Sequence, residues 1–156
     1  MVLGLGGGSI LELLRKNFSF TGRITAVEID SKIIEVAKDE FKIEQYKPLQ
    51  VVCQDAVEFV QTDIHSYETL IVDLFIDTQI PTAFLGDEFW QHVAKLLQPD
   101  AVVIFNAGIE NAHQEAIDIL MEKITPLISF KKLEDINGTN TLLLGKKVVE
   151  NKKPAK

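Results

Sequence analysis

The chain has 156 residues, 46% of them hydrophobic and 25% charged, which is the composition of a single globular domain with its own core. Its net charge of −7 argues against nucleic acid as a partner, because phosphate backbones are bound by clustered Lys and Arg. The single cysteine, Cys53, excludes an internal disulfide framework and a cysteine-based metal cluster. No apolar run reaches the length of a membrane span and no signal-peptide pattern follows Met1, so we expect a cytoplasmic protein without a membrane partner.

Short apolar segments typical of strands alternate with amphipathic segments typical of helices. In chain order, the expected elements are strand 1–5, helix 9–18, strand 23–28, a helix from 31 to about 41, strand 49–53, helix 55–61, strand 69–73, a helix that ends before Pro99, strand 101–106, helix 110–124, and strands 127–132 and 141–145. The last two strands have no helix between them, and Asn137-Gly138 predicts a tight turn there.

Several helix starts carry capping signals. Ser9 and Glu12 match a capping box, while Asp30 and Asp55 are expected to cap the helices that follow them. In the second helix, the apolar residues expected to face the core repeat every four positions: Ile33, Ala37 and Phe41.

The alternation predicts the α/β class, because strands that are apolar without strict alternation are typical of a parallel sheet covered on both faces. We expect a doubly wound, mostly parallel sheet of seven strands with the last strand antiparallel and with helices on both faces. Residues 1–146 would form this domain. Residues 147–156 are basic and poor in apolar residues, and we expect them to be a disordered tail.

Glycine or polar residues follow five of the expected strands. In a doubly wound sheet, ligands bind beyond the carboxyl ends of the strands, near the point where the strand order reverses. The residues at these exits are the run Gly4, Leu5, Gly6, Gly7 and Gly8, then Glu28, Asp55, Asp73 and Asn106. Five such exits on one edge predict a binding site.

The glycine run permits a tight turn and the close approach of a ligand, and the helix that follows it presents free amide groups. A tight turn without a ligand would show the same pattern, so the run alone is unspecific. Glu28 strengthens the binding interpretation, because a carboxylate at the end of the second strand can accept hydrogen bonds from ribose hydroxyls. A surface glutamate near a turn is the alternative interpretation.

Asp55 follows the third strand and could accept a hydrogen bond from an adenine amino group while the Ala56 amide donates to the ring. The alternative, that Asp55 only caps its helix, is compatible with this role. Ile29 and Gln54 flank the expected adenine slot and could form its walls.

Taken in order, Leu-Gly-Leu-Gly-Gly-Gly, Val-Glu-Ile-Asp, Gln-Asp-Ala and Val-Asp resemble the motif series of class I S-adenosylmethionine-dependent methyltransferases. The Val-Glu-Ile-Asp element, the loop after Asp73 and the segment 84–99 are similar to the spermidine synthase-like branch. The resemblance covers about residues 1 to 108. It implies S-adenosylmethionine as cofactor, ribose binding by Glu28 and adenine binding by Asp55. It also implies that Asp73 faces the substrate, with Asp77 as a second contact for a cation.

Two departures from that branch bear on the reaction. The resemblance implies an aspartate directly after the three glycines, which contacts the free amine of the decarboxylated cofactor, but Ser9 stands there. The loop after Asp73 reads Leu-Phe-Ile-Asp instead of Ser-Ser-Asp-Pro. A missing carboxylate removes a reason to exclude the carboxylate of S-adenosylmethionine itself, since like charges repel.

We therefore expect a methyltransferase acting on a small-molecule acceptor, with a cationic amine as one candidate. Two alternatives stay open: an aminopropyltransferase that uses decarboxylated S-adenosylmethionine and a polyamine, and a non-catalytic cofactor-binding module or partner subunit. No metal is expected, because His65, His92 and His113 are far apart in sequence. The sequence leaves a homodimer open.

Overall fold

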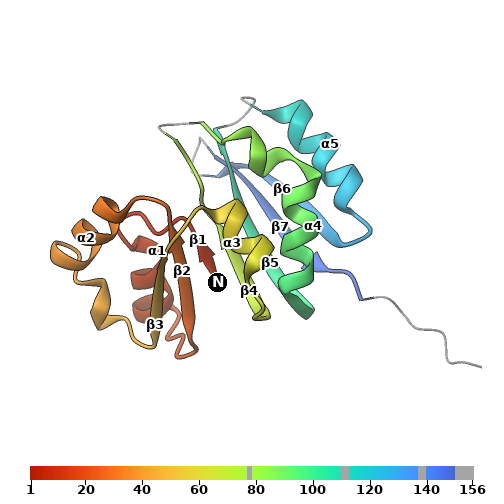
Figure 1. Cartoon of the computed structure of the whole chain (residues 1–156). Coiled ribbons are helices and arrows are strands. Elements are labelled where there is room, and N and C mark those ends of the chain that lie inside the picture. Colours follow the sequence, from red (N-terminus) through yellow and green to blue (C-terminus); the bar gives the residue numbers. More distant parts are fainter. Residues whose placement is uncertain (77–78, 110–112, 137–139, 150–156) are drawn as a thin grey trace, which may run out of the picture.

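The computed structural model describes residues 1–76, 79–109, 113–136 and 140–149 (Figure 1). Within them, seven strands form one sheet in the order β3-β2-β1-β4-β5-β7-β6. The strands are β1 (Val2–Leu3), β2 (Ile24–Glu28), β3 (Leu49–Cys53), β4 (Tyr67–Val72), β5 (Leu97–Ile109), β6 (Ile128–Ile136) and β7 (Asn140–Lys147). The neighbours from β3 to β5 pair in parallel, whereas β7 is antiparallel to both β5 and β6. The expected mostly parallel sheet with a reversed last strand is confirmed.

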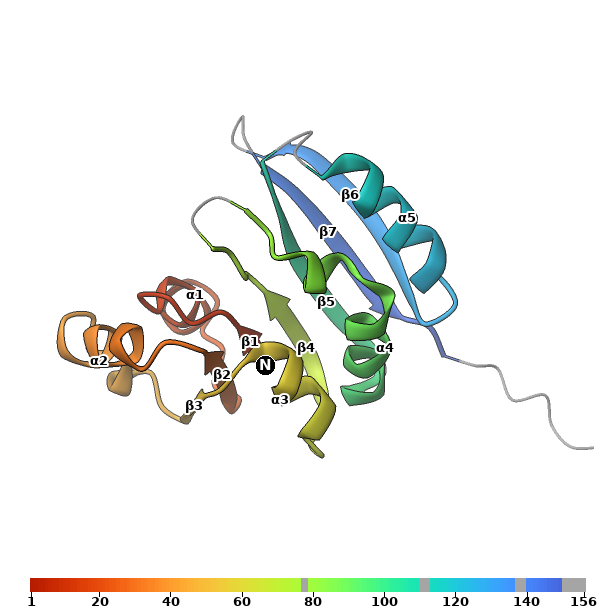
Figure 2. The ribbon, with the colours of Figure 1, turned by 45° about the horizontal axis from the view of Figure 1, so that its top comes forward.

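The helices in the described residues are α1 (Ser9–Glu12), which continues as the π-helical η1 (Leu13–Asn17), α2 (Ser31–Asp39), α3 (Ala56–Thr62), α4 (Asp87–Leu96) and α5 (Gln114–Ile124), with short 3-10 turns η2 (Ile43–Gln45) and η3 (Thr82–Leu85). None of them is long and apolar enough to cross a membrane. Helices cover both faces of the sheet, as expected. Figure 2 shows α4 and α5 lying along one side of the strands β5 to β7.

The buried hydrophobic residues form two clusters, one on each face of the sheet. One joins α3, α4 and α5 to the sheet, and the other joins α1 and α2 to the strands β1 and β2. The helices α1 and α2 leave part of β5 and β7 uncovered. As a result, Val102 in β5 and Leu144 in β7 remain 44% and 37% exposed. One face of the sheet is thus covered by three helices, and the other face is covered only in part.

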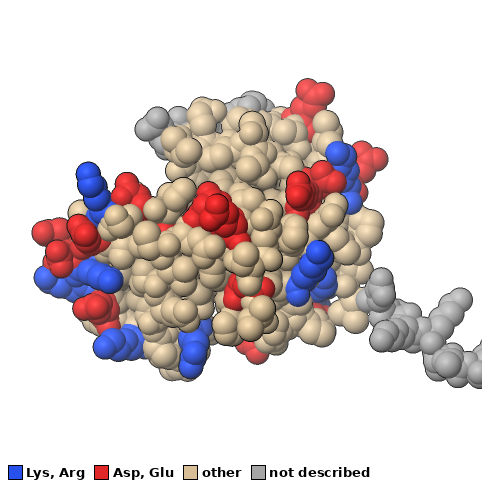
Figure 3. Space-filling view, in the orientation of Figure 1, with Lys and Arg blue, Asp and Glu red and all other residues tan. Residues whose placement is uncertain are grey.

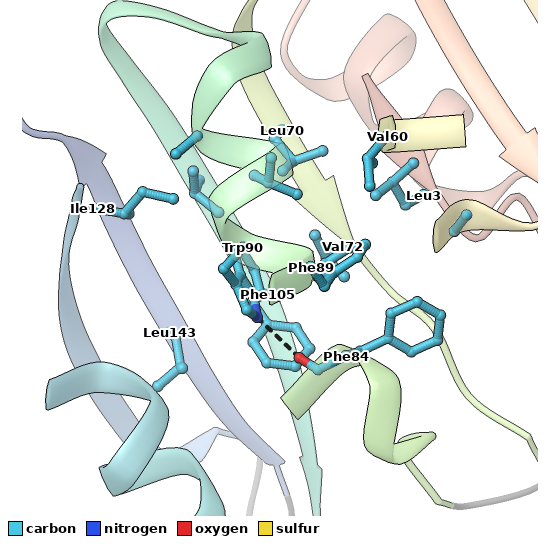
Figure 4. Close-up of a cluster of buried hydrophobic side chains, with 14 of the residues drawn as sticks. Leu3, Val60, Leu70, Val72, Phe84, Phe89, Trp90, Phe105, Ile128 and Leu143 are labelled. Carbon is cyan, nitrogen blue, oxygen red and sulfur yellow. Dashed lines mark hydrogen bonds between the residues drawn. The ribbon is translucent and has the colours of Figure 1, made fainter. Parts of the chain in front are cut away.

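The larger cluster is organised around Trp90, which is completely buried (Figure 4). Its ring packs against Phe89, Phe105 and Phe130 at centroid distances of 5.1 to 5.4 Å. Its indole N–H donates a 2.9 Å hydrogen bond to the carbonyl of Phe84 in η3. Because a buried indole needs a partner for its N–H, this bond fixes η3, one wall of the site described below, to the core.

Local details differ from the sequence-based expectations at two helices. The cap of α1 is Gly8, not Ser9, and no side chain caps that end, so the predicted capping box is wrong. In α2 the buried residues are Ile34 and Ala37. Ile33 and Phe41, which the four-residue repeat assigned to the core, are 40% and 55% exposed.

One expected helix cap is confirmed. Asp30 caps α2 by accepting a 2.8 Å hydrogen bond from the Lys32 amide. Strand β7 ends at Lys147, one residue beyond the domain boundary expected from the sequence. The predicted turn at 137–138 and residues 150–156 of the expected tail lie outside the described residues.

Candidate functional site

A cavity of about 330 Å³ lies at the carboxyl edge of the sheet, where the strands β1, β2 and β4 end. The loops that follow β1 to β4 line it, together with η3. This is also the point at which the strand order reverses, because β1 has β2 on one side and β4 on the other. Its volume is within the range typical of small-molecule sites.

The loop after β1 is shaped by close packing and by the cavity. A Cβ at Gly4 would lie 2.1 Å from the carbonyl oxygen of Asp73, so only glycine allows β1 and β4 to end this close together. A Cβ at Gly6 would project into open space, and Gly6 lines the cavity. Both residues have positive φ angles, of 91° and 49°. Gly4 is therefore demanded by packing, while Gly6 leaves room for a ligand.

The rest of the glycine run does not line the cavity. Leu5 is buried among the residues beneath α1 and α2. A Cβ at Gly7 would contact the ring of Phe41 at 3.4 Å, and one at Gly8 would lie 2.5 Å from the side chain of Ile43. These positions support the turn into α1.

Glu28 joins the first two loops. Its Oε2 accepts a hydrogen bond from the Gly6 amide at 3.2 Å, and its Oε1 accepts from the amides of Ile29 and Asp30 at 3.0 and 3.2 Å. The carboxylate is thus held by three backbone donors on the cavity wall. An oxygen with one donor keeps a further acceptor position, and on Oε2 that position is available to a hydroxyl of a ligand.

One carboxylate oxygen of Asp55 caps a helix, and the other is available to a ligand. Its Oδ1 caps α3 by accepting from the amides of Val57 and Glu58 at 2.7 and 3.1 Å. Among the described residues, no donor contacts Oδ2. Ala56 is the first residue of α3, where an amide has no acceptor within the helix. A free acceptor and a free donor therefore stand next to each other on the cavity wall.

Asp73 lies one residue beyond β4 and lines the cavity beside Gly4, the first glycine of the loop after β1. Asn106 in β5 donates a 2.9 Å hydrogen bond to its Oδ1. The neighbouring part of the wall, contributed by the loop after β4 and by η3, is apolar and includes Leu74, Phe75, Ile76, Pro81 and Phe84. The carboxylate thus borders an apolar recess of the cavity, which suits a cation carried on an aliphatic stem.

Of the residues singled out in the sequence, those that the structure brings together on the cavity wall are Gly4, Gly6, Glu28, Ile29, Gln54, Asp55, Ala56 and Asp73. Leu5, Gly7 and Gly8 lie outside it, and Asp77 lies outside the described residues. The sequence reasoning missed the apolar wall. The three consecutive apolar residues 74–76, which directly follow Asp73, could have indicated this wall. It also missed Ile33, which was assigned to the core and instead lines the cavity.

A second cavity, of about 310 Å³, lies at the opposite edge of the sheet. Asp63, His65 and Tyr67 form a hydrogen-bonded group there, on the edge away from the glycine loop. In the part of the chain that the structure describes, no cluster of three His, Cys, Asp or Glu residues is placed to hold a metal ion. The face in Figure 3 carries small scattered groups of acidic and basic side chains separated by uncharged surface.

Comparison with known proteins adds independent findings. The model of the spermine/spermidine synthase domain matches residues 1–133. A Drosophila melanogaster protein named eEF1A lysine and N-terminal methyltransferase homolog is 32% identical over 151 residues, which cover 88% of this chain. A Neisseria meningitidis polyamine aminopropyltransferase is 27% identical over 105 residues, which cover 67% of this chain. The chain spans only 22% of the Drosophila protein and 40% of the Neisseria protein.

Among solved structures, human methyltransferase-like protein 13 in complex with SAH superposes with a TM-score of 0.76 at 25% sequence identity. The superposition covers 99% of this chain and 73% of that one. The whole described sheet, with its reversed last strand, is therefore shared with a methyltransferase fold.

Proposed function

This chain belongs to the spermine/spermidine synthase domain family, and we propose that it binds S-adenosylmethionine and transfers the methyl group to the amino group of a lysine side chain in a protein. The observation that carries this proposal is the cavity at the carboxyl edge of the sheet. That cavity joins Gly6, Glu28 and Asp55 to Asp73 and its apolar wall.

The glycine-loop side of the cavity fits the nucleoside. Glu28 offers an acceptor to ribose hydroxyls, while Oδ2 of Asp55 and the Ala56 amide offer an acceptor and a donor to adenine. Ile29, whose side chain is 65% exposed, provides an apolar surface for the ring. Bound there, the cofactor would supply a methyl group already activated by its attachment to a positively charged sulfur.

The Asp73 side of the cavity fits a lysine. A lysine has one ammonium group on a stem of four methylenes, which matches one carboxylate that borders an apolar recess. The nucleophile must be a neutral amine when the new N–C bond forms; the bond between the methyl carbon and the sulfur would break in the same step, and the cofactor would leave as a neutral thioether. Asp73 is placed to accept a hydrogen bond from this amine through Oδ2 and to take up a proton, while the recess excludes water. The net charge of −7 would further favour the approach of a cationic acceptor.

The protein acceptor is supported by the relatives. The Drosophila, bovine, mouse and human relatives all carry names that include eEF1A lysine and N-terminal methyltransferase. A lysine side chain of a protein is therefore an acceptor that these names state directly.

Aminopropyl transfer to a polyamine is the second candidate. The matching family model and the Neisseria relative favour it. Ser9 argues against it, because the serine supplies no carboxylate beside the cofactor tail, where the aminopropyltransferase branch would place an aspartate.

The test offers both reactions to the same protein. The purified chain is incubated with labelled S-adenosylmethionine and eEF1A or a library of lysine-containing peptides, and in parallel with decarboxylated S-adenosylmethionine and putrescine. We expect methylated lysine, identified by mass spectrometry, and no aminopropylated polyamine. Asp73→Asn should abolish the product, whereas Asp39→Asn, at the exposed end of α2, should not. A polyamine product, or cofactor binding without methylation of any lysine, would overturn the proposal.

A further inference from the structure

The carboxylate of Asp73, the candidate catalytic group, is hydrogen-bonded to an asparagine of the neighbouring strand, and this asparagine is hydrogen-bonded to a second one in the next strand. Nδ2 of Asn106 donates to Oδ1 of Asp73 at 2.9 Å. Nδ2 of Asn140 donates to Oδ1 of Asn106 at 3.2 Å. The chain of bonds runs from β7 through β5 to the residue after β4, and all three side chains are partly buried.

The sheet topology brings these three residues together. The parallel register pairs Val72 with Phe105, so the next residues, Asp73 and Asn106, stand side by side at the carboxyl edge. Because β7 is antiparallel to β5, its first residue, Asn140, reaches that same edge. The amino end of the last strand thus meets the carboxyl ends of the parallel strands.

A β-bulge lies between β5 and β7 next to Asn106. The β5–β7 register shifts between Asn106 and Ile109, where three steps along β5 oppose two along β7. Gly108 lies in this bulge with a φ of 75°, a conformation that suits glycine. Its amide donates a 3.2 Å hydrogen bond to Oδ1 of Asn106. The bulge therefore supplies a second donor to the same oxygen.

The backbone donor fixes which way the Asn106 amide points. An asparagine can exchange its oxygen and nitrogen by rotation, and its neighbours decide between the two arrangements. The Gly108 amide can only donate, so it requires the oxygen of Asn106 on its side. The nitrogen must then face Asp73, where it can only donate. Asn140 adds a second donor to the oxygen and disfavours rotation further.

We propose that Asn106 and Asn140 are positioning residues for Asp73, holding its Oδ1 so that Oδ2 is presented to the acceptor amine. This inference rests on the proposed function for its catalytic part. Among the described residues, no donor contacts Oδ2 of Asp73. One oxygen is thus committed to the sheet and the other is left for the amine. A carboxylate held in one orientation loses less freedom when the amine binds, and a displacement of about 1 Å can cost roughly 100-fold in rate.

The kinetic test compares one variant that changes the donor but not the shape of the side chain with two variants that remove the side chain. We expect Asn106→Asp, which keeps the size of the side chain but replaces the donor with a carboxylate, to lower kcat by at least about 100-fold. Asn106→Ala should lower kcat by about 10- to 100-fold, and Asn140→Ala by about 3- to 10-fold. The Kd for S-adenosylmethionine should change by less than about twofold in all three, because Glu28 and Asp55 are untouched. Asn17→Ala, at the exposed end of η1, is the control.

A second measurement does not need activity. In the unliganded protein, the side-chain amide protons of Asn106 should exchange with solvent at least about 10-fold more slowly than those of Asn17, and Asp73→Ala should remove this protection. Fast exchange at Asn106 in the parent protein, or Asn106→Asp with unchanged kcat, would overturn the positioning role. If no lysine is methylated but the protection is found, the proposed function fails while the hydrogen-bonded arrangement stands.

Discussion

The carboxylate of Glu28 and the amide of Gly6 are joined by a 3.2 Å hydrogen bond across 22 residues of sequence. This bond connects the end of β2 to the loop after β1, so the residue proposed to bind ribose also holds the glycine loop in place. The other oxygen of Glu28 accepts from two further amides. The cavity wall is therefore built before any ligand enters.

Replacing Glu28 by glutamine should weaken cofactor binding strongly. A glutamine has one acceptor oxygen, so its NH₂ group must face either Gly6 or the amides of Ile29 and Asp30, donor against donor. We expect Glu28→Gln to lower the affinity for S-adenosylmethionine by about 10- to 100-fold, since a hydrogen bond to a charged group is worth roughly 1.5–3 kcal/mol. Calorimetric titration measures this. Glu35→Gln, on an exposed position of α2, is the matched control, and equal affinities of the two variants would contradict the role of Glu28.

Gly4 should tolerate no side chain. Its φ is 91°, and a Cβ would lie 2.1 Å from the carbonyl oxygen of Asp73. We expect Gly4→Ala to lower the free energy of unfolding by roughly 3 kcal/mol or more, through backbone strain and separation of β1 from β4. Urea unfolding provides the measurement. Gly86→Ala is the control, because a Cβ there makes an ordinary 3.5 Å contact; a comparable loss in both variants would show that the close approach is unimportant.

The features that the sequence predicted are those set by local pattern. Runs of apolar residues identified the strands, and polar residues at their ends identified the edge that carries the cavity. The direction of each strand followed from whether a helix preceded it. Asp30 was identified as a cap because an Asx side chain needs only its own next residues for this role.

The features that the sequence missed depend on partners far along the chain. Ile33 and Ile34 are equally apolar, and only the placement of α2 decides that Ile34 is buried and Ile33 lines the cavity. Gly8 replaces Ser9 as the cap of α1 because the loop geometry needs a left-handed residue there. Asn140 reaches Asn106 through a bulge between two strands that are antiparallel, which no local pattern encodes.

Thr141 offers a stabilising substitution. It is only 2% exposed, and among the described residues no partner contacts its hydroxyl. An unsatisfied buried hydroxyl costs free energy that a methyl group of the same shape does not. We expect Thr141→Val to raise the free energy of unfolding by about 1 kcal/mol. Thermal and urea unfolding would show the gain.

Thr25 provides the comparison for that substitution. It is similarly buried, at 7% exposed, but its hydroxyl interacts with the hydroxyl of Tyr67, a contact that by itself lowers the pKa of that tyrosine. Thr25→Val should therefore give no gain or a loss of about 1 kcal/mol. A gain of equal size at both positions would mean that the effect comes from the β-propensity of valine and not from the missing partner.

Asp63 should make the fold sensitive to acid. Its side chain is 6% exposed, and it accepts hydrogen bonds from the hydroxyl of Tyr67 at 2.6 Å and from the ring of His65 at 2.7 Å. Burial by itself raises the pKa of Asp63, but the hydrogen bonds from Tyr67 and His65 outweigh it and leave the pKa below its usual value. The same burial, aided by Asp63, raises the pKa of Tyr67, which stays a neutral donor.

The sign of the pH dependence follows from that lowered pKa. A carboxyl group with a lower pKa in the folded state stabilises the fold above its unfolded pKa of about 3.9, and this contribution disappears as the pH falls through the folded pKa. At pH 7, Asp63→Asn should cost about 1 kcal/mol in urea unfolding. Between about pH 4 and pH 2 the variant should lose less stability than the parent protein, so that the two curves converge. Asp39→Asn, at an exposed position, should follow the parent curve throughout, and a constant difference between Asp63→Asn and the parent down to pH 2 would show that the charge of Asp63 does not contribute.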